Sequence, residues 1–305
     1  MATPLIKAIT TSPKTNNCTL VTTRPFVSIF ENWTNLSVET IDNSSILANL
    51  KFVLNIRGAR YSNLFDLQSN DRSRIISSLC GIKNSVGNHR FPYSCHPPEK
   101  WIGQTHIFKR MCEVLKCGGI EVVDERPVLP ANEEQRTRIR EWLLHNLEAT
   151  KPFVVLHAGA SRSRPEKRWP YFEELASYLD SLGFGIVWIG GPDDAGLNKK
   201  LASAVGIDAT ALFNVLEIAE LGRKASFAVA NDSGPMHILS ASGIPVFGLF
   251  GPSSKQKNHA LGQQKRALSV IENWNSTLCL SDTSLSKLSL DNVIERIYKD
   301  GLLPN

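Results

Sequence analysis

The 305-residue chain lacks the features that would assign it to several common classes of protein. It has no apolar run near the roughly 20 residues that span a bilayer, and residues 1–17 contain no apolar core of signal-peptide length. No basic stripe is interleaved with aromatic residues, so we expect no nucleic-acid partner. The length and the 42% hydrophobic fraction instead predict a cytoplasmic protein with two domains of ordinary size.

Motifs for metals, nucleotides and covalent catalysis are also missing. The six cysteines include no CxxC pair, so we interpret them as reduced thiols and not as zinc ligands. The sequence contains no GxGxxG, GxxxxGK[ST], GxSxG, HExxH or HxxEH. We therefore expect no metal site. The net charge of +5 suits a small anionic ligand or brief contact with an acidic membrane face.

Short apolar runs alternate with helix-like segments, most clearly in the C-terminal half. There, strand-like runs lie at 153–159, 185–191, 227–231 and 245–251, and helix-like segments at 169–183, 193–205, 216–225 and 235–242. This alternation is typical of a parallel, doubly wound α/β sheet. The N-terminal half alternates less clearly. Helix-like segments lie at 3–12, 25–33, 72–81, 106–119 and 133–149, a strand-like run lies at 18–24, and a strand that ends near Asp66 is expected within 51–68.

The passage between the two halves is expected within residues 126–152, which begin with a proline-containing stretch. We place the domains at 1–140 and 141–305. The N-terminal domain opens on a helix-like segment, whereas a doubly wound domain normally opens on a strand.

Small and basic residues follow the first strand-like run of the C-terminal half. In a doubly wound domain, ligands bind where the loops after the strands meet. Ala158, Gly159 and Ala160 are small enough for backbone N–H groups to approach a ligand. Four cations and one acid come next, at Arg162, Arg164, Glu166, Lys167 and Arg168. This combination favours a phosphate or diphosphate, and the alternative is a solvated basic loop.

Two further loops are expected at the same edge. Residues 190–196 read GGPDDAG, where the alternative to a ligand loop is a tight turn with Asp193 or Asp194 capping the next helix. Residues 231–237 read NDSGPMH, where Asp232 or Ser233 suits the helix N-cap and the helix N-terminus can receive an anion. His237 either faces the ligand or is an ordinary core histidine. The three loops predict an anionic, nucleotide-like ligand, but their spacing does not define a reaction.

The segments "FVVLHAGASRSRPEKRWP", "IVWIGGPDDAG" and "FAVANDSGPMHILSASGIPVFGLFGPSS", in this order and spacing, resemble glycosyltransferase family 9, the ADP-heptose:lipopolysaccharide heptosyltransferases. The resemblance is strong over residues 153–254 and weak in the N-terminal half, at "TPLIKAI", "LFDLQSNDRS" and the helix after His106. It implies a GT-B fold of two facing Rossmann-like domains, with the donor bound by the C-terminal one and the acceptor by the N-terminal one.

The resemblance also implies roles for particular residues. Lys167 would stabilise the departing ADP phosphates, and Asp232 would contact the donor sugar; these two are the expected catalytic residues. Donor contacts are implied for Ala158, Gly159, Ala160, Ser161, Asp194, Ser233, Gly234 and His237. Acceptor-side contacts are implied, more weakly, for Asp66, Gln68 and Arg72. Family members invert the anomeric centre and need neither a metal nor another cofactor.

One departure from the family concerns the N-terminus. Family members begin with a strand and a Gly-Asp motif before "TPLIRAL", and that aspartate is the implied general base. Here Met1-Ala2-Thr3-Pro4 starts after this point, so we expect the N-terminal sheet to lack its first strand and the chain to lack the expected base. A misassigned start and a true truncation both remain open. Asp66 is the substitute considered for the base.

Three functions follow from these observations. The first is an inverting transfer of a heptose-type sugar from an ADP-sugar to a lipid-linked lipopolysaccharide core acceptor, in the cytoplasm or at the inner face of the cytoplasmic membrane. The second is a catalytically impaired or non-catalytic paralogue that binds a sugar nucleotide. The third is another GT-B enzyme, such as a sugar-nucleotide epimerase. The exact sugar, the acceptor and the oligomeric state are not encoded in recognisable motifs.

Overall fold

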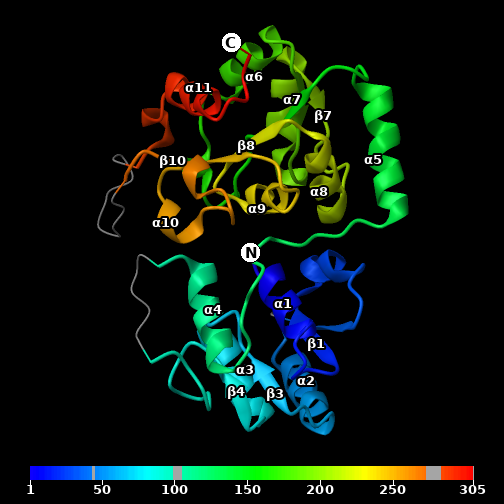
Figure 1. Ribbon diagram of the computed structural model, residues 1–305, viewed down its shortest axis with the longest axis vertical. Coiled ribbons are helices and arrows are strands. Elements are labelled where there is room, and N and C mark those ends of the chain that lie inside the picture. The colour runs from blue at the N-terminus through cyan, green and yellow to red at the C-terminus, as the bar shows by residue number, and fades with distance from the viewer. Residues whose placement is uncertain (43–44, 99–104, 273–282, 305) are drawn as a thin grey trace. The chain divides into compact units, whose positions relative to one another are not determined.

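The chain forms two compact units, Met1–Val128 and Leu129–Asn305, called unit 1 and unit 2 (Figure 1). The structure is a computed structural model that describes residues 1–42, 45–98, 105–272 and 283–304. The division lies within the passage expected at 126–152. The expected domain boundary at 140/141 falls instead inside helix α5 (Glu133–Asn146), which belongs to unit 2.

Unit 2 is built on one six-stranded parallel sheet, as the alternating pattern predicts. Its strand order is β10-β9-β8-β5-β6-β7. The strands are β5 (Phe153–His157), β6 (Gly185–Trp188), β7 (Ile207–Asp208), β8 (Phe227–Asn231), β9 (Val246–Phe250) and β10 (Ala267–Ser269). From β5 the chain builds outward first through β6 and β7, and then in the other direction through β8, β9 and β10. The order therefore reverses between β5 and β8, which is the topological switch point of a doubly wound sheet.

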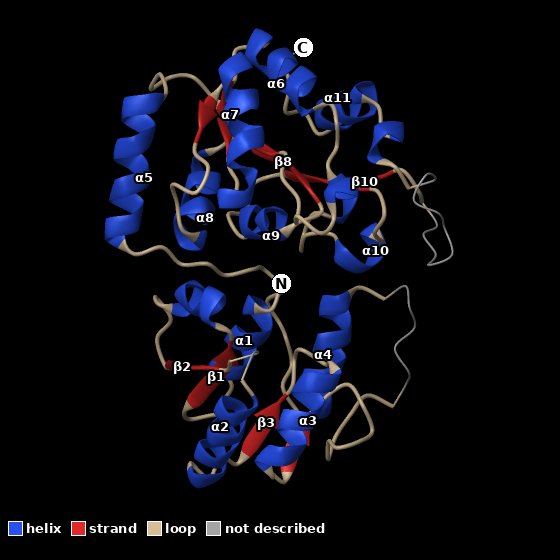
Figure 2. Cartoon of the chain, turned by 180° about the vertical axis from the view of Figure 1, so that it is seen from behind, coloured by secondary structure: helices blue, strands red, loops and turns tan. Residues whose placement is uncertain are grey.

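Helices cover both faces of this sheet (Figure 2). Successive side chains of β5 point to opposite faces, so Val154 and Leu156 enter one core and Phe153 and Val155 the other. The first core also contains residues of α6 (Phe172–Ser181), α7 (Ala195–Ala204) and α11 (Leu290–Lys299), and the second contains residues of α5, α8 (Val215–Lys224) and α9 (Gly234–Ser240). Both faces of the sheet are buried, which is why its strands read as continuous apolar runs.

Short turns complete unit 2 between these elements. The 3-10 turns are η2 (Pro165–Lys167), η3 (Pro192–Asp194), η4 (Gln264–Arg266) and η5 (Leu285–Lys287), and one short helix is α10 (Lys255–Asn258). The helix α11, which the sequence patterns left unassigned, packs against α6. Its N-cap is Ser289, whose side chain accepts a hydrogen bond from the Asn292 amide.

Unit 1 contains two separate pairs of parallel strands. The pairs are β1 (Cys18–Thr22) with β2 (Leu36–Thr40), and β3 (Asn63–Phe65) with β4 (Asn84–Val86). No strand within the described residues joins the pairs. The helices are α1 (Thr3–Thr10), η1 (Arg24–Phe30, a 3-10 helix), α2 (Ile46–Gly58), α3 (Asp71–Cys80) and α4 (Ile107–Cys117). In the described parts of the chain, no helix is long and apolar enough to cross a membrane.

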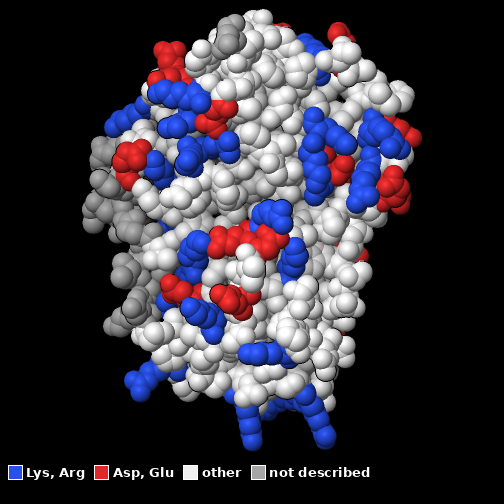
Figure 3. All heavy atoms as spheres, viewed as in Figure 1, with Lys and Arg blue, Asp and Glu red and all other residues white. Residues whose placement is uncertain are grey.

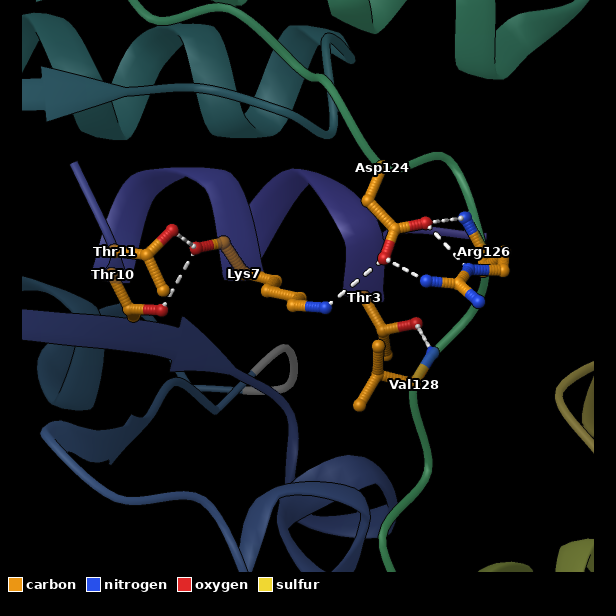
Figure 4. A network of polar contacts seen from close by, with 7 residues as sticks. All are labelled: Thr3, Lys7, Thr10, Thr11, Asp124, Arg126 and Val128. Carbon is orange, nitrogen blue, oxygen red and sulfur yellow. Dashed lines mark hydrogen bonds and ion pairs between the residues drawn. The ribbon is translucent and has the colours of Figure 1, made fainter.

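Helix α1 forms polar contacts with the last segment of unit 1 (Figure 4). The Thr3 hydroxyl accepts a hydrogen bond from the Val128 amide at 2.9 Å, and the Lys7 ammonium lies 3.2 Å from an Asp124 carboxylate oxygen. Arg126 lies on the same carboxylate and, with Lys7, holds the pKa of Asp124 well below its usual range. Contacts between residues far apart in sequence thus fix α1 within unit 1.

The described cysteines are free thiols, as expected from their spacing. These are Cys18, Cys80, Cys95, Cys112 and Cys117, and Cys279 lies outside the described residues. Burial, with a smaller effect of the Glu125 charge, raises the pKa of Cys112 to about 11. A thiol with that pKa stays protonated at neutral pH and is a poor nucleophile and a poor metal ligand.

We expect the packing of α11 to contribute strongly to the stability of unit 2. Ile297 is fully buried in the core shared with α6, so Ile297→Ala should lower the free energy of unfolding by about 2–5 kcal/mol. The neighbouring Tyr298 is 53% exposed, and Tyr298→Ala should change it by less than about 0.5 kcal/mol. Denaturant unfolding followed by circular dichroism measures both. Equal losses in the two variants would show that α11 is not packed as described.

Candidate functional site

Polar side chains gather at the carboxyl end of β5 and β8, at the switch point of the unit 2 sheet. The strands pair in register, with His157 opposite Ala230, so the loops that follow them leave the sheet side by side. The loop after β6 and the loop after β9 reach the same edge, as the following contacts show. The expectation that the three loops of the sequence converge is confirmed.

Lys167 and Asp232 form the ion pair that joins the loops after β5 and β8. The Lys167 ammonium lies 2.6 Å from Asp232 Oδ2, and the side chains are 20% and 9% exposed. The Ser253 hydroxyl, from the loop after β9, donates to the same oxygen at 2.6 Å. A 3-10 turn that begins with Pro165 carries Lys167 into this position. The pair is therefore partly desolvated and strong, yet within reach of solvent.

The start of α9 differs from the expected helix cap. Ser233 occupies the N-cap position, but no side chain caps the helix there. Asp232 is held by Lys167, and the Ser233 hydroxyl instead donates to the Asn231 carbonyl and lies 3.1 Å from His157 Nδ1. The N-cap is therefore at Ser233, one of the two expected positions, but neither side chain makes the cap hydrogen bond because both are engaged elsewhere.

Asn231 ties the loop after β5 to the end of β8. Its side chain is fully buried and its amide nitrogen donates to the carbonyl oxygens of Ala158 and Gly159, at 2.9 and 3.1 Å. Its amide oxygen accepts from the Trp169 backbone N–H at 3.1 Å. Both ends of the loop that carries Lys167 are thereby anchored on one side chain.

Asp194, from the loop after β6, points back toward β5. One carboxylate oxygen accepts from the Gly191 amide at 3.1 Å and lies 3.8 Å from His157 Nε2, and the other lies 3.7 Å from Arg168. Burial raises the pKa of this carboxyl, but the polar contact with His157, the Gly191 amide and the Arg168 charge outweigh burial and leave the pKa below its ordinary value. The tight turn is confirmed. The suggestion that Asp194 caps α7 is wrong, because its side chain makes no cap hydrogen bond there.

Two glycines make room for the Asp194 side chain. A methyl group on Gly159 would overlap the Asp194 carboxylate, and one on Gly190 would lie 2.8 Å from its Cβ atom. Ala158 and Ala160 beside Gly159 are buried, whereas Ser161 is exposed and lies 3.0 Å, hydroxyl to hydroxyl, from Ser163. The small residues of this loop thus serve close packing within the protein, a role that the sequence pattern did not indicate.

Each of the four cations in the loop after β5 faces a carboxylate. The pairs are Arg162 with Asp193 at 2.6 Å, Arg164 with Glu166, Lys167 with Asp232 at 2.6 Å, and Arg168 with Asp194 at 3.7 Å. The pairs of Arg162 and Arg164 are exposed to solvent, whereas the carboxylates that face Lys167 and Arg168 are largely buried. An anionic ligand that binds here replaces carboxylate partners and does not meet free cations.

The remaining predicted donor residues lie on α9, beside this cluster. Gly234 is exposed, with open space where a side chain would begin, and His237 is half-buried one turn further along. A cleft of about 270 Å³ is lined by Glu166, Arg168, Pro170, Pro252, Leu285 and their neighbours. Among the described residues, no group of three or more His, Cys, Asp or Glu side chains is arranged to hold a metal ion.

The three acceptor-side residues belong to unit 1. Asp66 is buried and accepts four hydrogen bonds, from the amides of Gln68 and Ser69 and the hydroxyls of Ser73 and Tyr93. Burial and the hydrogen bond to Asp66 raise the pKa of Tyr93. The Gln68 and Arg72 side chains are exposed. Asp66 therefore fixes the conformation of its own loop.

Sequence reasoning missed three contributors to the cluster. His157 is the one polar residue that ends the run "FVVLH", and Asn231 ends "FAVAN" in the same way. Because two neighbouring parallel strands both end on a buried polar side chain at the switch point, these residues carried a usable signal. Ser253 had no such signal, since its contact with Asp232 depends on how β9 ends.

Gly159 should tolerate no side chain. Gly159→Ala pushes the new methyl group into the Asp194 carboxylate, and overpacking of this kind costs about 1–3 kcal/mol. Gly196→Ala on α7 is the matched control, because nothing lies within 4 Å of the new methyl group, and it should be neutral or slightly stabilising. Thermal unfolding of both variants tests this. Equal melting temperatures would contradict the packing of Asp194 on Gly159.

The Asp194 carboxylate should make stability depend on pH in acid. Its pKa is lower in the folded than in the unfolded chain, so its stabilisation is present above the unfolded value and is lost as the pH falls through the folded value. Asp194→Asn should cost about 1–3 kcal/mol near neutral pH, and the difference from the unsubstituted protein should shrink below about pH 4.

The control for this prediction is Asp193→Asn. Asp193 is about half exposed and pairs only with exposed Arg162, so its loss should cost less than about 1 kcal/mol at any pH. Urea unfolding at a series of pH values gives both curves. A difference for Asp194→Asn that stays constant down to the acid limit would show that the carboxylate is not selectively stabilised in the folded state.

Comparisons with known proteins agree with this geometry. The sequence model of the family described as "Glycosyltransferase family 9 (heptosyltransferase)" matches residues 50–288. The chain is 28% identical over 131 residues to lipooligosaccharide heptosyltransferase 2 of Haemophilus influenzae, and the match covers 40% of this chain and 38% of that protein. The chain thus matches less than half the length of this curated relative.

Two solved structures share the fold over nearly the whole chain. A glycosyl transferase of family 9 from Veillonella parvula superposes with a TM-score of 0.84 at 21% identity, covering 99% of this chain and 92% of that one. A heptosyltransferase from Escherichia coli, solved with ADP, superposes with a TM-score of 0.71 at 18% identity, covering 98% and 95%. The expected GT-B class of fold is confirmed by these likenesses.

Proposed function

Because the chain belongs to glycosyltransferase family 9, the heptosyltransferase family, we propose that it transfers a heptose-type sugar from an ADP-sugar to a lipopolysaccharide core acceptor. The observation that carries the proposal is the Lys167–Asp232 pair at the switch point of unit 2. It sets a cation and a carboxylate where a doubly wound domain binds nucleotides. The related E. coli heptosyltransferase solved with ADP supports an adenine nucleotide as the donor's leaving group.

The donor diphosphate takes the Lys167 ammonium from Asp232 in this proposal. A diphosphate carries more charge than one carboxylate and offers more acceptor oxygens, so the lysine gains by the exchange. Asp232 keeps its hydrogen bond from Ser253 and turns to a hydroxyl of the donor sugar. Ser233, Gly234 and His237 on α9 contact the phosphates, with Ala158 to Ser161 contributing from the loop after β5. Asp194 binds the donor from the loop after β6.

The transfer step breaks the bond between the sugar's anomeric carbon and the diphosphate oxygen. An acceptor hydroxyl forms the new bond from the opposite face, which inverts the anomeric centre. Negative charge grows on the departing ADP, and the Lys167 ammonium lies where it stabilises that charge. The acceptor proton leaves as the bond forms and requires a general base. We do not assign Asp66 to this role, because four donors already occupy its carboxylate.

The alternative function is sugar-nucleotide binding without transfer, and the saturated carboxylate of Asp66 is the observation that favours it. The two functions share the donor site and differ only in chemistry. Incubation of the 305-residue protein with ADP-heptose and a Kdo–lipid A acceptor separates them. Release of ADP with a heptosylated product supports transfer, nucleotide binding with no product supports the alternative, and a converted free nucleotide sugar indicates an epimerase.

Lys167→Met should weaken ADP binding. Removing a charge-assisted contact to a diphosphate costs about 1.5–3 kcal/mol, so the dissociation constant should rise by at least about ten-fold in titration calorimetry. Lys151→Met is the matched control, because Lys151 also pairs with an aspartate, Asp180, at 3.3 Å, but lies before β5. If ADP binds both variants equally, or does not bind the unsubstituted protein, the donor site is not at the Lys167–Asp232 pair.

A further inference from the structure

Helix α2 is apolar on both of its sides. Phe52, Val53 and Ile56 point inward to a core that includes Cys80 of α3. On the other side, Leu47, Leu50 and Leu54 recur at helical spacing and are 79%, 49% and 65% exposed. A strip of large apolar residues on a helix is normally covered by another surface. The outer side of α2 therefore lacks a cover within the described chain.

Helix α3 continues this apolar surface. It packs against α2, and its Ile75 and Leu79 are 58% and 46% exposed. The end of α2 also reaches the end of α3, since the Arg57 guanidinium lies about 3.4 Å from where a side chain on Gly81 would begin. We name the five exposed residues Leu47, Leu50, Leu54, Ile75 and Leu79 the α2–α3 face. They make up five of the twelve large exposed apolar residues in the described chain, so the exposure is concentrated and not scattered.

The α2–α3 face is set among basic residues. The stretch from residue 45 to residue 83 has six Lys or Arg and two Asp or Glu. Asp66 is buried, and Asp71 pairs with Arg74, so neither acid offsets the other cations. The remaining five are Lys51, Arg57, Arg60, Arg72 and Lys83, all exposed. Within the described residues, none of these five forms an ion pair with a carboxylate.

The position of the charges matches that of the leucines. On α2, Lys51 and Arg57 lie on the same side as Leu47, Leu50 and Leu54, and on α3, Arg72 lies on the side of Ile75 and Leu79. On the face drawn in Figure 3, Lys and Arg side chains project from the end of unit 1 that carries α2 and α3, with no acidic side chain among them.

We propose that the α2–α3 face docks unit 1 on an anionic phospholipid bilayer. Leucine and isoleucine side chains enter the boundary between headgroups and acyl chains, while the surrounding cations meet lipid phosphates. A second copy of the chain is the poorer partner, because it brings the same uncompensated positive charge. A protein interface is also disfavoured, since the face has no Tyr or Trp anchor. The proposal deepens the proposed function, since a lipid-linked acceptor lies in a membrane.

Vesicle flotation tests the proposal without donor, acceptor or catalysis. The full chain should float with phosphatidylcholine vesicles that contain phosphatidylglycerol and much less with phosphatidylcholine alone, and added salt should release part of it. ADP binding by calorimetry on the same sample is the independent readout of the donor site. If the protein binds vesicles but not ADP, the docking proposal stands and the proposed function fails. If it binds ADP but not vesicles, the proposed function stands and the docking proposal fails.

Two matched pairs of variants locate the contact. Leu54→Ser should weaken binding on the order of ten-fold, whereas Leu144→Ser on α5, whose leucine is 64% exposed against 65% for Leu54, should leave it unchanged. Lys51→Glu should weaken binding by at least about five-fold, whereas Lys199→Glu on α7 should not. All four side chains are exposed, so the variants should fold, which circular dichroism verifies.

Three results would overturn the proposal. Equal flotation with neutral and anionic vesicles would remove the role of the cations. Equal effects of Leu54→Ser and Leu144→Ser would place the contact elsewhere. Sedimentation that shows a dimer which Leu54→Ser dissociates, with vesicle binding intact, would assign the face to self-association.

Discussion

The geometry of the site depends on the side-chain amide of Asn231. This group is inaccessible to solvent. It holds the two ends of the loop that carries Lys167, through the carbonyls of Ala158 and Gly159 and the amide of Trp169. A loop with two fixed ends loses most of its freedom. The anchored backbone therefore places Lys167 close to Asp232. The ion pair forms without a ligand.

The same organisation sets the electrostatics of the site. Every cation in the loop has a carboxylate partner, so the folded protein does not leave a cluster of like charges without compensation. Such a cluster would be costly beside a buried His157 and a buried Asn231. In the proposed function, a donor diphosphate competes with these carboxylates for cations that are already in position. Under that proposal, a ligand with fewer charges or fewer acceptor oxygens gains less from the exchange.

The sequence predicted most strands and helices of both units, but in unit 1 it missed β2, α2 and β4. Strands buried on both faces give continuous apolar runs, so β5, β6, β8 and β9 could be read directly. The loops after them could be placed together because parallel strands end at one edge. The contacts of individual side chains at that edge of the sheet could not be predicted from the sequence. Asp232 suits a helix cap by its position in the sequence. Its ion pair with Lys167, 65 residues away, follows only from the fold. Gly159 suggested only a close approach of a ligand, and the fold adds that its missing side chain makes room for the Asp194 carboxylate.

The exposed leucines of helix α2 made the helix hard to recognise in the sequence, and they also suit it to contact another surface. Helical periodicity is visible only when one side is polar, and α2 has leucines on the side that faces away from the core. The strand expected to end near Asp66 is β3, but the helix that precedes it, residues 46–58, was not recognised. Leucines that face water lower the solubility of a protein. Since cations of the same helix surround that side, the cost is offset where a negatively charged, partly apolar surface covers both kinds of side chain at once.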